Sequence, residues 1–292
     1  MTAPSAALAA RVARIVGQQP VEWAPIVGGY TPAARWRVLF GGYSLFVKAA
    51  TTELTAQMLR AEQRVYEVVT GSFMPRYVGG DDDGEAPIIV IEDLSGAAWP
   101  PPWDAALVDD VLEALDRVHA QRPRPPLTPG VPSAAGGWRS VAADPQDFLA
   151  VGLASAAWLE TSLDALLAAE AACVVDGPAL THFDVRSDNL CRTLAGVKLV
   201  DWAEARLGNP DLDIGFWLPS LACEGGPLPE SILPDAPQVA AWVSGFFAAR
   251  AGLADIHDAP RVRGIQRAQL WTALPWAIRA LGLAPPSSPV NV

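Results

Sequence analysis

One stretch of this sequence limits what the chain can fold into more than any other. Residues 180–215 read LTHFDVRSDNLCRTLAGVKLVDWAEARLGNPDLDIG, in a chain of which only 18% of residues are charged. They place a histidine, an asparagine and several acids between runs typical of short buried strands. Acidic and amide side chains are favoured in turns, so their number alone has a structural explanation. Their order is more specific and requires another reason.

Asp184, Asn189 and Asp201 are the residues of this stretch that fit a chemical task. Transfer of a phosphoryl group from a nucleotide needs a carboxylate that orients a hydroxyl and accepts its proton. It also needs oxygen ligands for magnesium, which bridges the phosphates. These three side chains would supply both kinds of group, and the alternative is that they are ordinary turn residues.

The chain before position 95 differs in pattern from the chain after it. Strand-like runs with alternating apolar residues surround one run with helical spacing, which predicts an antiparallel sheet with one helix. The strand-like runs are 21–27, 35–40, 44–50, 76–80 and 87–94, and the helical run is 52–69. After a proline-rich break, helices are predicted at 103–121, at 145–175 with one interruption, and from Gly215 to about Leu283. We therefore expect an α+β protein with a small strand-rich lobe, 1–94, and a larger helical lobe, 95–292.

The net charge of −11 argues against a nucleic-acid binder, because such proteins depend on neutralising phosphates. The apolar runs are too interrupted to predict a membrane span. The first residues lack the positive region of a signal peptide, so we interpret them as an amphipathic leading helix of a cytoplasmic protein. Part of the acidity lies in DDDGE, residues 81–85, which is predicted to be a solvated hairpin tip. The oligomeric state is not predicted.

The motif HxDxxxxN, formed by His182, Asp184 and Asn189 and followed by Asp201, resembles the aminoglycoside phosphotransferase and choline kinase family. That family has the two-lobed protein-kinase-like fold. The resemblance implies Asp184 as catalytic base, Asn189 and Asp201 as metal ligands, and His182 as structural support of the catalytic loop. It also implies that Asp213 braces this loop. The cofactors implied are ATP or GTP with Mg²⁺, and the partner is a small hydroxylated acceptor.

Lys48 ends the third predicted strand, where kinases hold the lysine that contacts nucleotide phosphates. Arginine fills 19 of the 21 basic positions, so a lysine retained here favours function over an exposed charge. Glu62, on the following helix, matches the glutamate that pairs with this lysine. An exposed helix charge is the alternative for Glu62, because Glu53 and Glu67 lie on the same helix.

Two further segments are candidates for nucleotide contacts. Gly28 and Gly29 occupy the place of the glycine-rich phosphate loop and allow a close backbone turn, and Thr31 offers a hydroxyl to a phosphate. This loop departs from the kinase GxGxxG pattern, so a simple hairpin turn is the alternative. The segment IEDL, which includes Glu92 and Leu94, resembles the hinge whose backbone groups meet the adenine.

Arg186 stands two residues after Asp184, where protein kinases place a lysine near the transferring phosphoryl group. It is a candidate for stabilising the charge that develops there. The alternative is an ion pair with Asp188 or Asp211. His119, at the end of a predicted helix, is interpreted as satisfying the helix C-terminus.

The acceptor is the least constrained part of the prediction. From Gly215 onward the chain has five acids and five arginines, so it shows no local excess of negative charge. The same region is rich in apolar and aromatic residues, which favours a small hydroxylated acceptor with at most one or two amines over a polycationic aminoglycoside. The candidate pocket residues are Glu204, Asp211, Glu224 and Trp217, although core packing is the alternative for the tryptophan.

Two other functions compete with a kinase of small molecules in general. Within the enzyme class, the chain is alternatively a dedicated aminoglycoside-resistance kinase. In a different class, it is a nucleotide-binding scaffold that has lost catalysis. A protein kinase is disfavoured because HFD replaces HRD and DWA replaces DFG.

Overall fold

The computed structural model describes residues 4–131, 136–257 and 259–286. The N-terminal part contains a five-stranded antiparallel sheet with strand order β1-β2-β3-β5-β4. The strands are β1 (Glu22–Pro25), β2 (Ala34–Phe40), β3 (Tyr43–Ala49), β4 (Tyr77–Asp81) and β5 (Ile88–Glu92). Gly41 and Gly42 form the two-residue turn between β2 and β3, which sets the register that pairs Phe40 with Tyr43 and Arg35 with Lys48.

The helix α2 (Glu53–Val68) connects β3 to β4. It begins with a capping box, in which the Thr52 hydroxyl accepts from the Thr55 amide at 3.3 Å and the Thr55 hydroxyl accepts from the Thr52 amide at 2.9 Å. Glu62 and Val65 lie three residues apart and therefore share the buried face of the helix. The carboxylate of Glu62 is therefore buried beside the sheet.

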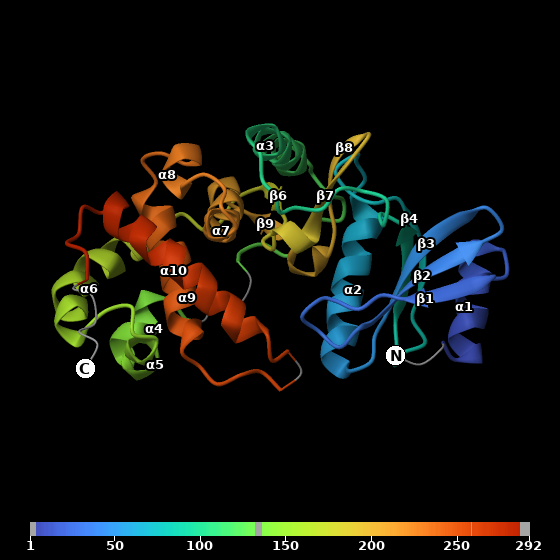
Figure 1. Ribbon diagram of the computed structural model, residues 1–292, viewed down its shortest axis with the longest axis horizontal. Helices are drawn as coiled ribbons and strands as arrows, with labels where there is room; N and C mark the ends of the chain where they lie inside the picture. The colour runs from blue at the N-terminus through green and yellow to red at the C-terminus, as the bar shows by residue number, and fades with distance from the viewer. Residues whose placement is uncertain (1–3, 132–135, 258, 287–292) are drawn as a thin grey trace.

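The leading helix α1 (Ala6–Val16) was expected and is present. Its Val12 is fully buried in a small core with Val38, Phe40 and Val90 of the sheet. Figure 1 shows α1 at the outer side of the sheet, at the opposite end of the molecule from α4, α5 and α6.

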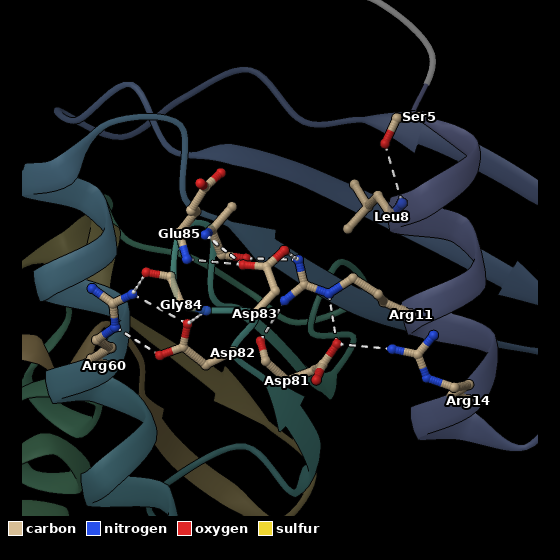
Figure 2. Close-up of polar contacts among 11 residues, drawn as sticks. Ser5, Leu8, Arg11, Arg14, Arg60, Asp81, Asp82, Asp83, Gly84 and Glu85 are labelled. Carbon is tan, nitrogen blue, oxygen red and sulfur yellow. Dashed lines mark hydrogen bonds and ion pairs between the residues drawn. The ribbon is translucent and has the colours of Figure 1, made fainter.

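The acidic turn between β4 and β5 is exposed at residues 82–85, as the sequence predicts, and arginines from two helices also bind it (Figure 2). Arg11 of α1 donates to Asp81 at 2.6 Å and to Asp83 at 2.7 Å. Arg60 of α2 donates to Asp82 at 2.7 Å. The turn therefore joins the two helices through ion pairs, which hydropathy alone does not predict.

The rest of the described chain is mainly helical. The longer helices are α3 (Ala105–His119), α6 (Ala156–Ala171), α7 (Pro210–Cys223), α9 (Pro237–Ala251) and α10 (Val262–Ala280), and the shorter ones are α4 (Trp138–Ala143), α5 (Gln146–Ala150) and α8 (Pro229–Ile232). Two small antiparallel ladders pair β6 (Ala179–Thr181) with β9 (Arg206–Gly208) and β7 (Leu190–Thr193) with β8 (Gly196–Leu199). In Figure 1 these ladders lie between the large sheet and the helices.

Two helices differ from the sequence prediction. Helix α7 begins at Pro210 rather than Gly215, because the Asn209 side chain accepts from the Asp211 amide and proline suits the first helical position. Asp213 therefore lies in the first turn of a helix and not in a loop. Helix α4 was predicted to be loop, since it is short and follows a segment rich in glycine and proline.

The sheet and the helical region share one hydrophobic core. Val65 and Phe73, which belong to the N-terminal part, are in the same buried cluster as Leu199 and Trp202. The Leu199 amide also donates to the Phe73 carbonyl at 2.7 Å, so β8 is fixed to the segment after α2. Within the three described ranges, no helix is long and apolar enough to cross a membrane.

Replacing Arg11 by alanine should lower the free energy of unfolding by about 1–2 kcal/mol, because its 12% exposed side chain binds two carboxylates and two carbonyls. Arg14→Ala is the matched control on the same helix. Its side chain is 66% exposed and makes one contact to Asp81, so the loss should be about 0.5 kcal/mol or less. Urea unfolding measures both; equal losses would contradict the role given to Arg11.

Candidate active site

A cavity of about 880 Å³ is bordered by residues of the sheet, the β6–β9 region and helices α7, α9 and α10. The predicted residues that border it are Gly28, Gly29, Thr31, Lys48, Glu62, Glu92, Leu94, Asp184, Arg186, Asn189, Asp201 and Glu204. Most of the candidate site, drawn from positions far apart in the sequence, therefore lies around one cavity.

Lys48 lies at the centre of a buried ionic cluster. Its ammonium donates to Glu62 at 2.8 Å and to Asp201 at 2.9 Å, and its side chain is 6% exposed. Burial disfavours the charged ammonium, but the carboxylates of Asp201 and Glu62 outweigh this effect and raise the pKa of Lys48. Burial likewise opposes ionisation of Asp201, yet Lys48 holds the pKa of this carboxyl below its usual range. The lysine is therefore fixed as a cation.

Asp213 lies beneath the loop that carries Asp184. Its fully buried carboxylate accepts from the backbone amides of His182 and Phe183, at 2.9 and 2.7 Å, and from the His119 ring at 2.9 Å. Burial opposes its charge, but the His119 hydrogen bond and the other donors lower the pKa of Asp213. His119 ends α3, but in the described ranges its ring bonds to Asp213 and not to a carbonyl of the helix C-terminus, a contact that the sequence analysis missed.

His182 supports the next residue of the loop. Its Nδ1 accepts from the Asp184 amide at 3.2 Å, and its Nε2 therefore carries the proton that is donated to the Val200 carbonyl at 3.0 Å. Burial lowers the pKa of His182, which keeps this neutral tautomer at neutral pH. The His182 ring thus links the backbone of Val200, which follows β8, to the backbone of Asp184.

Asp184 is held from two sides with its carboxylate toward the cavity. Asn189 Nδ2 donates to one carboxylate oxygen at 2.8 Å, and the Arg186 guanidinium lies 2.9 Å from the other. Burial raises the pKa of Asp184 to about 6, although Arg186 acts in the opposite direction. Arg186 also pairs with Asp188 at 3.0 Å, so one of its two suggested ion pairs is present, together with a contact to Asp184.

Asn189 and Asp201 each have one side-chain oxygen that suits a magnesium ion. Asn189 uses Nδ2 for Asp184 and Asp201 uses Oδ1 for Lys48, while Asn189 Oδ1 and Asp201 Oδ2 accept no hydrogen bond from the described chain. Magnesium prefers such hard oxygen ligands and completes its shell with water and phosphate oxygens. The described residues contain no cluster of three or more His, Cys, Asp or Glu side chains that could hold a metal ion.

Arg35 is a site residue that the sequence analysis did not identify. It lies opposite Lys48 in the β2–β3 ladder and donates to the Gly28 carbonyl at 3.3 Å and to the Thr31 hydroxyl at 3.2 Å. Gly29 has φ +73°, and a Cβ there would lie 2.7 Å from the guanidinium. The Gly41-Gly42 turn was the available signal, because counting back from it pairs Arg35 with Lys48.

Tyr30 and Arg261 form a second contact that the sequence did not reveal. The Tyr30 ring lies 4.8 Å from the Arg186 guanidinium and 5.6 Å from that of Arg261. Arg261 also donates to the Gly29 carbonyl. The segment of Gly29 and Tyr30 therefore contacts both Arg186, beside Asp184, and Arg261 at the start of α10, and the latter contact spans more than 200 residues of sequence.

At the expected hinge, backbone and side-chain groups have different roles. The Leu94 amide donates to no group in the described ranges and borders the cavity, so it is available to a purine. The Glu92 carboxylate instead accepts from the Arg76 amide at 2.9 Å and from Lys198 at 2.5 Å. Lys198, the second lysine of the chain, thus fixes β8 to the end of β5.

Of the four candidate acceptor residues, the structure places one at the cavity. Glu204 borders it, whereas Asp211, Glu224 and Trp217 do not. Trp217 is fully buried against Trp103, as the core alternative predicted. Glu224 accepts from the Ser187 hydroxyl at 2.5 Å and from the Trp103 ring at 2.8 Å. It therefore binds the loop that carries Asp184 without bordering the cavity.

Comparison with known proteins adds a family and related folds. The model of the phosphotransferase enzyme family matches residues 22–256. A search of curated proteins found no match. A thermostable mutant of aminoglycoside phosphotransferase APH(4)-Ia, in complex with ADP and hygromycin B, has a TM-score of 0.61 at 14% identity and covers 98% of this chain and 100% of that one.

Two other solved structures are similar over nearly the whole chain. Spectinomycin phosphotransferase APH(9)-Ia, in complex with ADP and spectinomycin, has a TM-score of 0.61 at 11% identity, covering 97% of this chain and 100% of that one. A putative fructosamine-3-kinase from Haemophilus somnus has a TM-score of 0.54 at 11% identity, covering 94% and 95%. The two-lobed kinase-like fold predicted from the sequence is confirmed.

The raised pKa of Asp184 predicts an acidic limit of activity. A protonated carboxyl cannot accept the proton of a hydroxyl, so turnover should rise with pH through about 6 and level off above it. Arg186→Gln removes a cation that lowers this pKa, and the limb should move to higher pH. The pH profile of magnesium-dependent ATP turnover measures this, with Arg64→Gln, an exposed change on α2, as control. An unmoved limb in Arg186→Gln would contradict the assignment.

Gly29→Ala should weaken nucleotide binding by roughly tenfold or more, because the new Cβ displaces Arg35 from Gly28 and Thr31. Gly17→Ala is the matched control: its φ is +75°, and nothing lies within 4 Å of a Cβ there. Both variants should lose about 1 kcal/mol of stability from left-handed strain. Calorimetry with ADP separates the effects, and equal affinity in the two variants would refute the role of Gly29.

Proposed function

The chain belongs to the phosphotransferase enzyme family and is a small-molecule kinase, and from this premise we propose its reaction. It transfers the γ-phosphoryl group of a magnesium-bound nucleoside triphosphate to a hydroxyl group of a small molecule. The observation that supports this most is the position of Lys48 within 2.9 Å of Asp201, at the same cavity as Asp184 and Asn189.

Asp184 is the proton acceptor in this reaction. The oxygen of the acceptor hydroxyl forms a bond to the γ-phosphorus while the bond to the β–γ bridging oxygen breaks. The hydroxyl proton passes to an Asp184 carboxylate oxygen, which Asn189 and Arg186 hold toward the cavity. The lowest activation energy is expected above the pKa of this carboxyl, where its acceptor form predominates.

The nucleotide is held by groups of both lobes. The Leu94 amide is available to the base, the backbone of Gly28 and Gly29 approaches the phosphates, and Lys48 carries the compensating charge. Magnesium, when bound by Asn189 and Asp201, neutralises phosphate charge. The presence of ADP in the similar structures of two phosphotransferases supports the nucleotide.

Asp184→Asn should reduce phosphoryl transfer by about 10²–10⁴-fold while nucleotide affinity stays nearly unchanged, because the amide keeps the shape but accepts no proton. Asp164→Asn, an exposed change on α6, is the control. Turnover is followed as ADP release with a panel of aminoglycosides, amino alcohols and sugars. ADP binding is measured by calorimetry with and without magnesium.

Two results would refute this function. Full activity in Asp184→Asn would contradict the assignment of Asp184 as the base. If the wild-type protein bound ADP with an affinity independent of magnesium, the ligand roles of Asn189 and Asp201 would be contradicted. Magnesium-dependent binding without turnover of any acceptor would favour the inactive scaffold.

A further inference from the structure

The part of the cavity beyond Asp184 has a different lining from the nucleotide side. Its wall is made by α7, α9, α10 and the connection before α10. The described residues that α9 and α10 place there are Phe246, Phe247, Arg250, Val262, Arg263, Ile265, Gln266 and Gln269. Among them there is no carboxylate. Among the described residues, the acids that border the cavity are Glu62, Glu92, Asp93, Asp184, Asp188, Asp201 and Glu204, and none of these lies on α9 or α10.

Aromatic rings form one face of this wall, starting next to the proposed base. Phe183 directly precedes Asp184 and contacts Phe216 edge to face at a centroid distance of 6.0 Å. Phe216 in turn contacts Phe246 at 5.0 Å and Phe247 at 6.0 Å. All four rings border the cavity. A flat apolar group that lies along them would have its neighbouring hydroxyl close to Asp184.

Gln269 is the buried polar group of this wall. It is 7% exposed and borders the cavity, and its side-chain amide makes no hydrogen bond to any residue in the described ranges. The amide atoms of Gln269 are not among the fully buried, unpaired side-chain atoms of the described residues, so they remain accessible. Gln269 lies one turn beyond Gln266 on the same face of α10, and both border the cavity, so this amide is available to a ligand there.

Arg263 supplies a positive charge on the same helix. Its guanidinium donates to the Ala254 carbonyl at 3.2 Å and to Gln266 at 2.7 Å, and it forms no ion pair within the described part of the chain. Arg250, on α9, lies close enough to be affected by this charge. Burial lowers the pKa of Arg250, and repulsion by Arg263 lowers it further. An anion beside Arg263 is therefore favoured, whereas an ammonium is repelled.

We propose that the acceptor has a flat apolar body and a carboxylate, with Arg263 binding the carboxylate and Gln269 binding a neutral oxygen or nitrogen. This proposal rests on the phosphotransferase function above and specifies its substrate class. The sequence-based expectation was a small hydroxylated acceptor with at most one or two amines, and this proposal narrows it to an anionic acceptor, because an amine at this wall would face the Arg263 guanidinium. A polycation has no carboxylate to bind on α9 or α10 in the described ranges.

Three probes of one shape test the charge preference. 3-Phenyllactate, 3-phenylpropane-1,2-diol and phenylalaninol share a phenyl body and a hydroxyl, and at neutral pH they are anionic, neutral and cationic. Their dissociation constants are measured by calorimetry with magnesium and ADP present. 3-Phenyllactate should bind about ten- to a hundredfold more tightly than the diol, the scale of a hydrogen bond to a charged group, and phenylalaninol should bind most weakly.

Variants assign the preference to residues. Arg263→Ala should remove the preference for 3-phenyllactate over the diol. Arg267→Ala should keep it, because this arginine is exposed one turn further along α10, does not border the cavity and donates to the Ala251 carbonyl. Gln269→Leu, which keeps the side-chain volume, should weaken all three probes by about tenfold. Thermal unfolding checks that each variant is folded.

Each outcome decides the proposal. Equal or tighter binding of phenylalaninol, no binding of 3-phenyllactate, or an unchanged preference in Arg263→Ala overturns it. If magnesium-dependent ADP binding persists in these cases, the phosphotransferase function stands and only the acceptor class is wrong. If ADP binds without magnesium dependence or fails to bind, the function itself fails, and this proposal fails with it.

Discussion

The ammonium of Lys48 is the contact on which the active-site geometry depends, because it joins three separate segments. It lies on β3, Glu62 lies on α2, and Asp201 follows β8. Burial of each ion costs several kcal/mol, so the cluster is stable only while every charge keeps its partners. Loss of one partner from such a cluster typically costs about 3–5 kcal/mol, since it leaves an uncompensated buried charge. Lys48, the proposed phosphate-binding lysine, is therefore positioned by the packing of both lobes.

The catalytic loop depends on a second buried carboxylate. Phe183 and Asp201 have φ of 58° and 64°, which is unfavourable for residues with a Cβ by about 1–2 kcal/mol each. Two hydrogen bonds to Asp213, from the His182 and Phe183 amides, fix the backbone at Phe183, and the bond to Lys48 fixes the Asp201 side chain. Phe183 directly precedes the proposed base Asp184, and Asp201 is itself a proposed magnesium ligand. The strain is compensated by buried polar contacts, and their rigidity holds Asp184 in place.

The sequence was sufficient for residues whose roles follow from local spacing. His182, Asp184 and Asn189 lie within eight positions; Asp184 and Asn189 border one cavity with Lys48 and Asp201, and His182 is hydrogen-bonded to the Asp184 backbone beside it. It was insufficient where a contact joins distant segments with no fixed spacing. Tyr30 meets Arg186 and Arg261 only after the lobes have packed, and neither periodicity nor composition encodes that contact. The start of α7 was missed because Asn209 and Pro210 are also common in turns.

The distribution of paired charges explains why the net charge of −11 says little about the acceptor. Asp81 and Asp83 are bound by Arg11, while Asp213 is satisfied by backbone amides and His119. Screening by solvent and neutralisation by such neighbours confine each charge to its surroundings. A ligand in the cavity therefore responds to the few groups that border it. On the helical wall those groups are aromatic rings, amides and guanidinium groups, so an acidic protein presents a cationic surface to its acceptor.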